Sequence, residues 1–134
     1  MAIESRRLRG LVARAGVPTT EPNPRTIINV VIPERTVPVF KGAPGTYREL
    51  VGTAELTLTD EGVVAEMELP PYLAAELLRD GGLNAHIEGE GGFGETRYNP
   101  ETGGRDVVLD GLRVRTLYCS GDAPAWNDLW MEER

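Results

Sequence analysis

Hydrophobic and polar residues alternate most regularly between residues 53 and 69. Ala54, Leu56 and Leu58 are apolar in the first run, the second run carries apolar residues from Val63 to Leu69, and Asp60-Glu61-Gly62 separates the two. Strict alternation gives each segment one buried face and one solvated face, and a glycine supplies the left-handed backbone that a short turn requires. The pattern predicts an antiparallel hairpin with strands over 53–59 and 63–69.

A short helix is predicted directly after this hairpin. Pro70-Pro71 ends the second strand, and the following residues 72–80 place three leucines on one side before Gly81-Gly82. Proline is favoured in the first turn of a helix and glycine just past its end.

Two further alternating segments follow the helix. Residues 83–88 alternate again, and a second hairpin is predicted with strands over 106–109 and 112–118. Its turn is Asp110-Gly111, a favoured pair for two-residue hairpin loops. Residues 50–120 are therefore interpreted as an antiparallel β body with one helix.

The N-terminal segment 1–49 does not show the regular alternation of the β body. Residues 1–16 carry an apolar stripe that ends at Gly16, which predicts a short helix. Residues 17–24 contain three prolines and predict an extended arm. The β-branched run 26–32 predicts a strand that is buried or paired with a partner, and the prolines from Pro33 to Pro44 favour an edge position.

The C-terminal segment 121–134 is predicted to be helical. Trp126, Leu129 and Trp130 have the spacing of one helix face. Such a face either closes the core of its own domain or anchors an interface with another protein.

Length and composition agree with a mainly β fold of α+β type. The 134 residues allow one modest domain, and 16 Gly and 10 Pro favour turns and extended segments over a helical bundle. We expect a small antiparallel sheet or sandwich with one short helix, an extended N-terminal arm and a C-terminal helix. A lone cysteine excludes an internal disulfide framework and fits a reducing compartment.

Charge is distributed unevenly along the chain. The net charge is −7, yet residues 1–16 carry +3, from four arginines against Glu4, so the remainder carries −10. The acidic balance makes nucleic acid an unlikely partner, and no apolar run is long enough to span a membrane. The basic segment is interpreted either as an arm that docks on another protein or as a helix lying on its own acidic domain.

A glycine-rich string at residues 89–94 has the form G-x-G-x-x-G. In its context, IEGEGGFGETRY, it resembles the glycine-rich loop that covers ATP phosphates in protein kinases. The other kinase motifs are missing, and no helix follows, as a dinucleotide-binding turn would require. Glu88, Glu90 and Glu95 would repel a phosphate. We interpret the string as a plain loop and expect no cofactor.

His86 is the centre of the remaining candidate chemistry. With Glu88 and Glu90 it could line one strand face and hold a divalent metal, although a solvated polar face explains the same pattern. With Ser120 or Cys119 it could form a hydrolytic site of protease type. The sequence lacks the sharp glycine-flanked turn that exposes a nucleophilic serine, so we expect no catalytic residue. No second His or Cys ligand lies near His86, so we expect no metal.

The middle of the chain resembles small head proteins of tailed bacteriophages. The segments that carry this resemblance are VGTAELTLTDEGVVAEMELP, PYLAAELLRDGG and VLDGLRVRTLY. A similar order of hairpin, leucine-rich helix and further strands occurs in phage prohead proteases. The His-Asp motif of that family is absent, and LNAHIEGEG carries no serine where the family has its nucleophile. The resemblance, over residues 50–118, implies the scaffold without the activity.

The sequence thus predicts a non-enzymatic virion protein of a tailed phage. The expected role is a minor capsid or decoration protein bound to the head shell, assembled in the host cytoplasm. Its partners would be further copies of itself or a major capsid protein. A small soluble binding or regulatory module of the cytoplasm is the alternative, besides the hydrolase. The residues predicted to contact a partner are Arg6, Arg7, Arg9, Arg14, Ile27, Ile28, Val30, Ile32, Trp126, Leu129 and Trp130.

Overall fold

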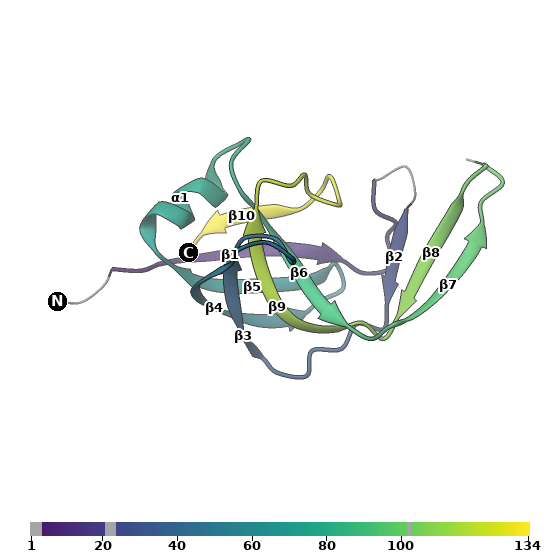
Figure 1. Cartoon of the computed structure of the whole chain (residues 1–134), viewed down its shortest axis with the longest axis horizontal. Coiled ribbons are helices and arrows are strands. Elements are labelled where there is room, and N and C mark those ends of the chain that lie inside the picture. Colours follow the sequence, from purple (N-terminus) through teal and green to yellow (C-terminus); the bar gives the residue numbers. More distant parts are fainter. Residues whose placement is uncertain (1–3, 21–23, 102) are drawn as a thin grey trace.

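The protein is described here by a computed structural model that covers residues 4–20, 24–101 and 103–134. Within these residues the chain forms ten strands and one helix (Figure 1), which confirms the mainly β class with one short helix. In chain order the elements are β1 (Arg6–Arg14), β2 (Arg25–Ile28), β3 (Thr36–Lys41), β4 (Glu49–Leu58), β5 (Gly62–Leu69), α1 (Pro71–Leu78), β6 (Asn84–Glu90), β7 (Phe93–Tyr98), β8 (Arg105–Asp110), β9 (Arg113–Ser120) and β10 (Trp130–Glu133).

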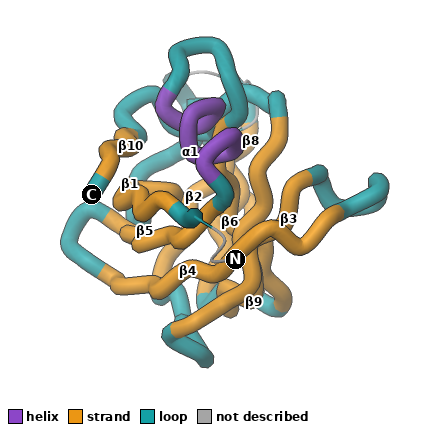
Figure 2. Tube along the Cα trace, turned by 90° about the vertical axis from the view of Figure 1, so that its left-hand side faces the viewer, coloured by secondary structure: helices purple, strands orange, loops and turns teal. Residues whose placement is uncertain are grey.

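The strands form two sheets of different character. The larger sheet has the order β10-β1-β5-β4-β3-β9-β6 and is antiparallel except where β3 meets β9. It curls so that β6 approaches β1, and α1 lies against one end of it (Figure 2). We call this curled sheet with α1 the body. The smaller sheet has the order β2-β8-β7 and extends away from the other end of the body (Figure 1). We call it the projecting sheet.

The core of the body is built from the inward faces of its strands and from α1. Leu8 of β1, Val39 of β3, Leu73 of α1 and Leu117 of β9 are 0% exposed. Full burial of such side chains stabilises a fold by about 1.5–3 kcal/mol each, which makes this cluster the main source of stability. The elements that supply it span the whole length of the chain.

The structure confirms the first predicted hairpin and the helix. Strands β4 and β5 pair in antiparallel register from Thr53 with Glu68 to Leu58 with Val63. Gly62 has a φ of +144°, and a Cβ there would lie 2.0 Å from the carbonyl oxygen of Ala13. Only glycine fits this turn, because any side chain would collide with β1.

The helix predicted over 1–16 is wrong, because residues 6–14 form β1. This strand pairs with β5 on one side and with β10 on the other, so tertiary contacts satisfy its backbone along both edges. Gly10 permits the close approach of β10: a Cβ there would lie 2.7 Å from the Trp130 carbonyl oxygen and from the Met131 sulfur. A short helix with an internal glycine is marginal by itself, so the sheet prevails.

The predicted C-terminal helix is also wrong. Residues 121–129 form a loop that carries the buried Trp126, and the chain ends in β10 beside β1. The expected division into an N-terminal arm, a body and a C-terminal helix therefore differs from what the structure shows, since β1, β3 and β10 are strands of the same sheet as β4 and β5.

The expected edge position of the proline-containing segment differs in the same way. Strand β3 lies between β4 and β9, although it contains Pro38. Pro38 sits opposite Thr53 of β4 but precedes the stretch Val39–Lys41 that pairs with β9. The missing N–H of proline therefore falls outside the stretch that pairs with β9.

The second predicted hairpin is wrong in its pairing. Strands β8 and β9 exist, but they belong to different sheets: β8 pairs with β7 and β2, whereas β9 pairs with β6 and β3. At Asp110-Gly111 the chain therefore passes from the smaller sheet to the larger one and does not form a hairpin turn.

Candidate functional site

The projecting sheet is the continuation of a ribbon that leaves the body. Strand β6 runs into β7 through Gly91 and Gly92, and β8 returns into β9 through Gly111. These glycines have φ values of +71°, +83° and +78°, a region that glycine adopts without strain. Both sides of the ribbon therefore bend at the same level, and the outer half forms a sheet of its own.

The base of the projecting sheet is held by the segment that contains β2. Ile27 is 6% exposed and belongs to the core, while the Gly111 N–H donates to the Ile28 carbonyl at 3.0 Å. Asn29 adopts a φ of +51°, and its Nδ2 donates to Oδ1 of Asp110 at 2.9 Å. The projecting sheet is thus fixed to the body on the side of β2.

The far end of the projecting sheet is closed by Asn99. Its backbone N–H donates to the Gly104 carbonyl and its carbonyl accepts from the Gly103 N–H, both at 2.9 Å. Its side-chain Oδ1 accepts from the Glu101 N–H at 3.0 Å, and its Nδ2 donates to Oδ2 of Asp106 at 3.3 Å. Such local hydrogen bonds are typical of asparagine in turns.

Strand β7 is the outer strand of the projecting sheet, and all six of its residues are exposed. Within the described residues its other side carries no neighbouring strand. Phe93 is 80% exposed and Tyr98 is 69% exposed, which is unusual for aromatic side chains. Glu95 and Arg97 form an ion pair on one face, with Nη2 of Arg97 3.2 Å from Oε2 of Glu95. An open strand edge flanked by exposed aromatics is a surface suited to pairing with another protein.

A second cluster lies on the outer face of the body. Phe40, Tyr118 and His86 are neighbours across β3, β9 and β6, and the rings of His86 and Tyr118 stack with centroids 5.0 Å apart. The guanidinium of Arg48 lies 4.4 Å from the centroid of the Phe40 ring and donates to Oε1 of Glu88 at 3.0 Å. This cluster ties the β3–β4 connection to the ribbon.

The pKa directions in this cluster fit a structural role. The pKa of Glu88 is lowered, first by the hydrogen bond from the Thr116 hydroxyl at 2.7 Å and then by Arg48. The pKa of His86 is lowered by burial, against an opposing effect of Asp122. Glu88 is therefore held ionised and His86 is held neutral at pH 7.

Within the part of the chain that the structure describes, no hydrogen bond joins His86 to either nucleophile considered for hydrolysis. Cys119 is 0% exposed, and burial raises the pKa of its thiol to about 12, so the thiolate is not available at neutral pH. The Ser120 hydroxyl donates to Oδ2 of Asp122 at 3.0 Å, and His86 stacks on Tyr118. Among the described residues there is also no group of three or more His, Cys, Asp or Glu side chains placed to hold a metal ion.

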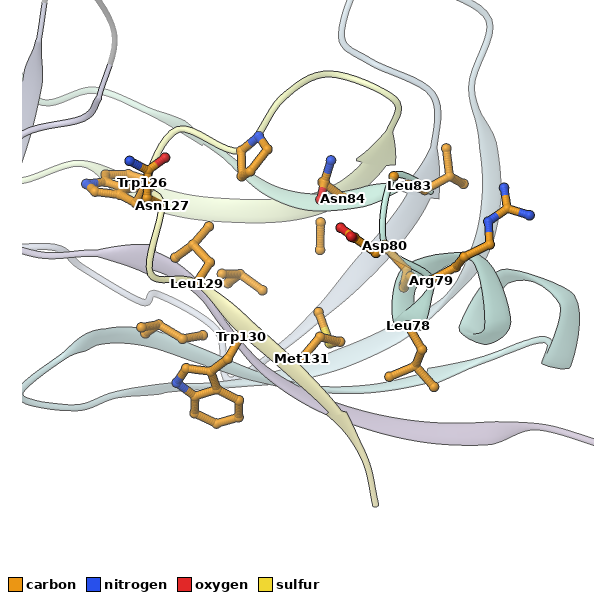
Figure 3. Close-up of a pocket in the computed structure, with 16 residues that line it drawn as sticks. Leu78, Arg79, Asp80, Leu83, Asn84, Trp126, Asn127, Leu129, Trp130 and Met131 are labelled. Atoms are coloured by element: carbon orange, nitrogen blue, oxygen red, sulfur yellow. The ribbon is translucent and has the colours of Figure 1, made fainter.

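The C-terminal tryptophans line a cavity of about 310 Å³ between the end of α1 and the loop before β10 (Figure 3). Trp126 is 5% exposed, and its Nε1 donates to the Val17 carbonyl at 2.9 Å. Leu129 and Trp130 are half-buried beside it. The three residues line the same cavity of their own chain, but they do so from a loop and a strand and not as one helix face.

The structure also places the predicted basic arm within the sheet. Three arginines of β1 meet acidic side chains of the same chain: Arg6 pairs with Glu133, Nε of Arg9 lies 4.0 Å from Glu66, and Arg14 lies 2.9 Å from Asp128. Arg7 lines a hollow with acidic neighbours on β4 and β5. The charge asymmetry seen in the sequence is thus largely compensated within the fold.

The predicted partner strand is likewise paired inside the chain. Ile27 and Val30 are buried, Ile28 and Ile32 are half-buried, and β2 runs parallel to β8 from Arg25 to Ile28. Contact of these residues with a partner stays a prediction. The sequence interpretation missed β7 because the strand begins inside the glycine-rich string 89–94, which was interpreted as a loop.

No family model, curated protein or solved structure matches this chain. The described residues contain no helix long and apolar enough to cross a membrane.

Proposed function

We propose that this protein is a structural attachment protein of a tailed-phage particle, a minor capsid or decoration protein without enzymatic activity. The observation that carries the proposal is the projecting sheet, which presents an open strand edge with an exposed aromatic residue at each end of β7. The resemblance of residues 50–118 to small head proteins of tailed phages is the reason for naming a tailed-phage particle as the assembly to which the protein attaches. Attachment takes place through the projecting sheet rather than through the terminal segments.

The arrangement of the terminal segments supports this choice. Three of the four arginines of β1 lie against acidic side chains of the same chain, and Trp126 is buried in the core. Phe93, by contrast, leaves about four fifths of its surface in solvent. An exposed aromatic side chain beside an open strand edge fits a contact surface, because a strand added at that edge would cover it.

The proposal is tested on particles made by cells that carry the genome encoding this chain. Particles purified on a density gradient should contain the chain in a fixed ratio to the major shell protein, measured by quantitative mass spectrometry. A chain found only in the soluble fraction would overturn the proposal.

A matched pair of variants locates the contact. Phe93→Ser should remove the chain from the particles, whereas Tyr47→Ser, which changes a 91% exposed aromatic residue on the body, should leave incorporation unchanged. Equal incorporation of both variants would contradict attachment through the projecting sheet.

A further inference from the structure

The hydrogen bonds of β8 determine which backbone groups of β7 are open. The Val107 N–H donates to the Pro24 carbonyl and the Gly111 N–H donates to the Ile28 carbonyl. The backbone N–H and C=O groups of the odd-numbered residues of β8 therefore point toward β2. The backbone groups of the even-numbered residues of β8 therefore point toward β7, where they pair with those of Phe93, Glu95 and Arg97. The bond from the Asn99 N–H to Gly104 at the end of the same ladder gives the same alternation.

The open edge of β7 consequently presents the N–H and C=O groups of Gly94, Thr96 and Tyr98. Three residues of this spacing are sufficient for six hydrogen bonds to an antiparallel strand of equal length. Charged residues on an edge strand usually oppose pairing with other chains. On β7 the order of the charges matters, because Glu95 and Arg97 flank Thr96 symmetrically.

We propose that β7 pairs with β7 of a second copy of this chain, antiparallel and centred on Thr96. In this register Glu95 of one copy lies opposite Arg97 of the other, twice, and Gly94 lies opposite Tyr98, also twice. The opposite charges attract, and the tyrosine ring covers the bare backbone of the glycine. The pairing deepens the proposed function and rests on it, since it names a partner for the same projecting sheet.

The neighbouring registers are disfavoured by the same charges. A shift that keeps the open backbone groups paired moves the centre to Glu95 or to Arg97. Each of these shifts places two like charges directly opposite one another, which destabilises strand pairs. The centre at Thr96 is therefore selected by both the hydrogen-bonding parity and the charge pattern.

The shape of the molecule permits this contact. Strand β7 lies at the end of the long axis away from α1, and its Phe93 end is the one nearer the body (Figure 1). Antiparallel pairing sets the Phe93 end of one strand beside the Tyr98 end of the other. The two bodies then lie at opposite ends of the shared ribbon, and the result is a continuous sheet in the order β2-β8-β7-β7-β8-β2.

The experiment uses two charge variants of the full chain. Glu95→Arg alone and Arg97→Glu alone each place four like charges at the contact, so each variant should dimerise at least about tenfold more weakly than the native chain. A mixture of the two variants restores both opposite-charge pairs and should form heterodimers. The double variant Glu95→Arg/Arg97→Glu should dimerise like the native chain.

Native mass spectrometry and sedimentation at concentrations on the order of 100 µM provide the readout, because small interfaces are weak. A native chain that stays monomeric overturns the pairing, and so do single variants that dimerise normally or a mixture that forms no heterodimer. Incorporation into particles is scored separately with Phe93→Ser. A native chain that dimerises but is absent from the particles refutes the proposed function alone, and a native chain that stays monomeric but enters the particles refutes the pairing alone.

Discussion

The body and the projecting sheet are both built from β-strands, but they differ in what they bury. Leu117 in the body is 0% exposed, whereas Phe93 in the projecting sheet is 80% exposed. The body is explained by its own core, because each of its strands contributes to one buried cluster. All six residues of β7 are exposed in the projecting sheet, so the outer edge of this strand is open to the partner proposed above.

The largest effect that separates the two regions is expected from truncation in the body. Leu117→Ala should lower the free energy of unfolding by about 2–5 kcal/mol, since it leaves a cavity in the packed core. Urea unfolding followed by circular dichroism measures this change. A loss of unfolding free energy below about 1 kcal/mol, which is typical of substitutions at exposed positions, would show that the core of the body does not stabilise the chain.

A smaller effect is expected from closing the gap between β1 and β10. Gly10→Ala places a methyl group within 2.7 Å of the Trp130 carbonyl and should destabilise the chain by about 1–3 kcal/mol. Gly121→Ala is the matched control, because nothing lies within 4 Å of its added Cβ. Thermal unfolding of both variants should show a lower midpoint for Gly10→Ala only, and equal midpoints would argue against β10 as a strand of the body.

The pH dependence of stability should come from the body as well. His86 is the only histidine of the sequence, and burial lowers its pKa below the ordinary value of 6.5. The unfolded chain therefore binds a proton more readily than the folded one, so stability declines as the pH falls below 6.5 toward the pKa of the folded state. His86→Phe should flatten the dependence of the unfolding free energy on pH just below pH 6.5. An unchanged slope would contradict the assigned burial.

The smallest effect on stability is expected in the projecting sheet. Phe93→Ser should change the free energy of unfolding by less than about 0.5 kcal/mol, because the side chain makes little contact with its own chain. The same variant is expected to have a large effect on attachment. A marked loss of stability in differential scanning calorimetry would show that Phe93 packs internally, and the contrast between the regions would fail.

The sequence predicts correctly those parts of the fold that are determined by residues close to one another in the chain. The hairpin around Gly62 and the helix after Pro70 follow from the hydrophobic periodicity of a few residues and from the glycines and prolines that end each element. The element at residues 6–14 is decided instead by β10, which is more than a hundred residues away, and by the space at Gly10. Local propensity cannot anticipate such a contact.

The candidate site was hidden from the sequence for a related reason. Glycine-rich segments are compatible with loops, turns and bends, so residues 89–94 and Asp110-Gly111 did not reveal a ribbon that changes sheet. The exposed aromatics and the Glu95–Arg97 pair become meaningful only once β7 is known to be an edge strand. Their spacing is visible in the sequence, but the open side of the strand is not.

Hydrogen exchange on β7 tests the central claim most directly. Amide exchange of the native chain, followed by NMR from dilute to concentrated solution, should slow at Gly94, Thr96 and Tyr98 as the concentration rises. The amides of Glu95 and Arg97 point toward β8 and should be protected at every concentration. Exchange at Gly94, Thr96 and Tyr98 that stays fast and independent of concentration would contradict pairing at this edge.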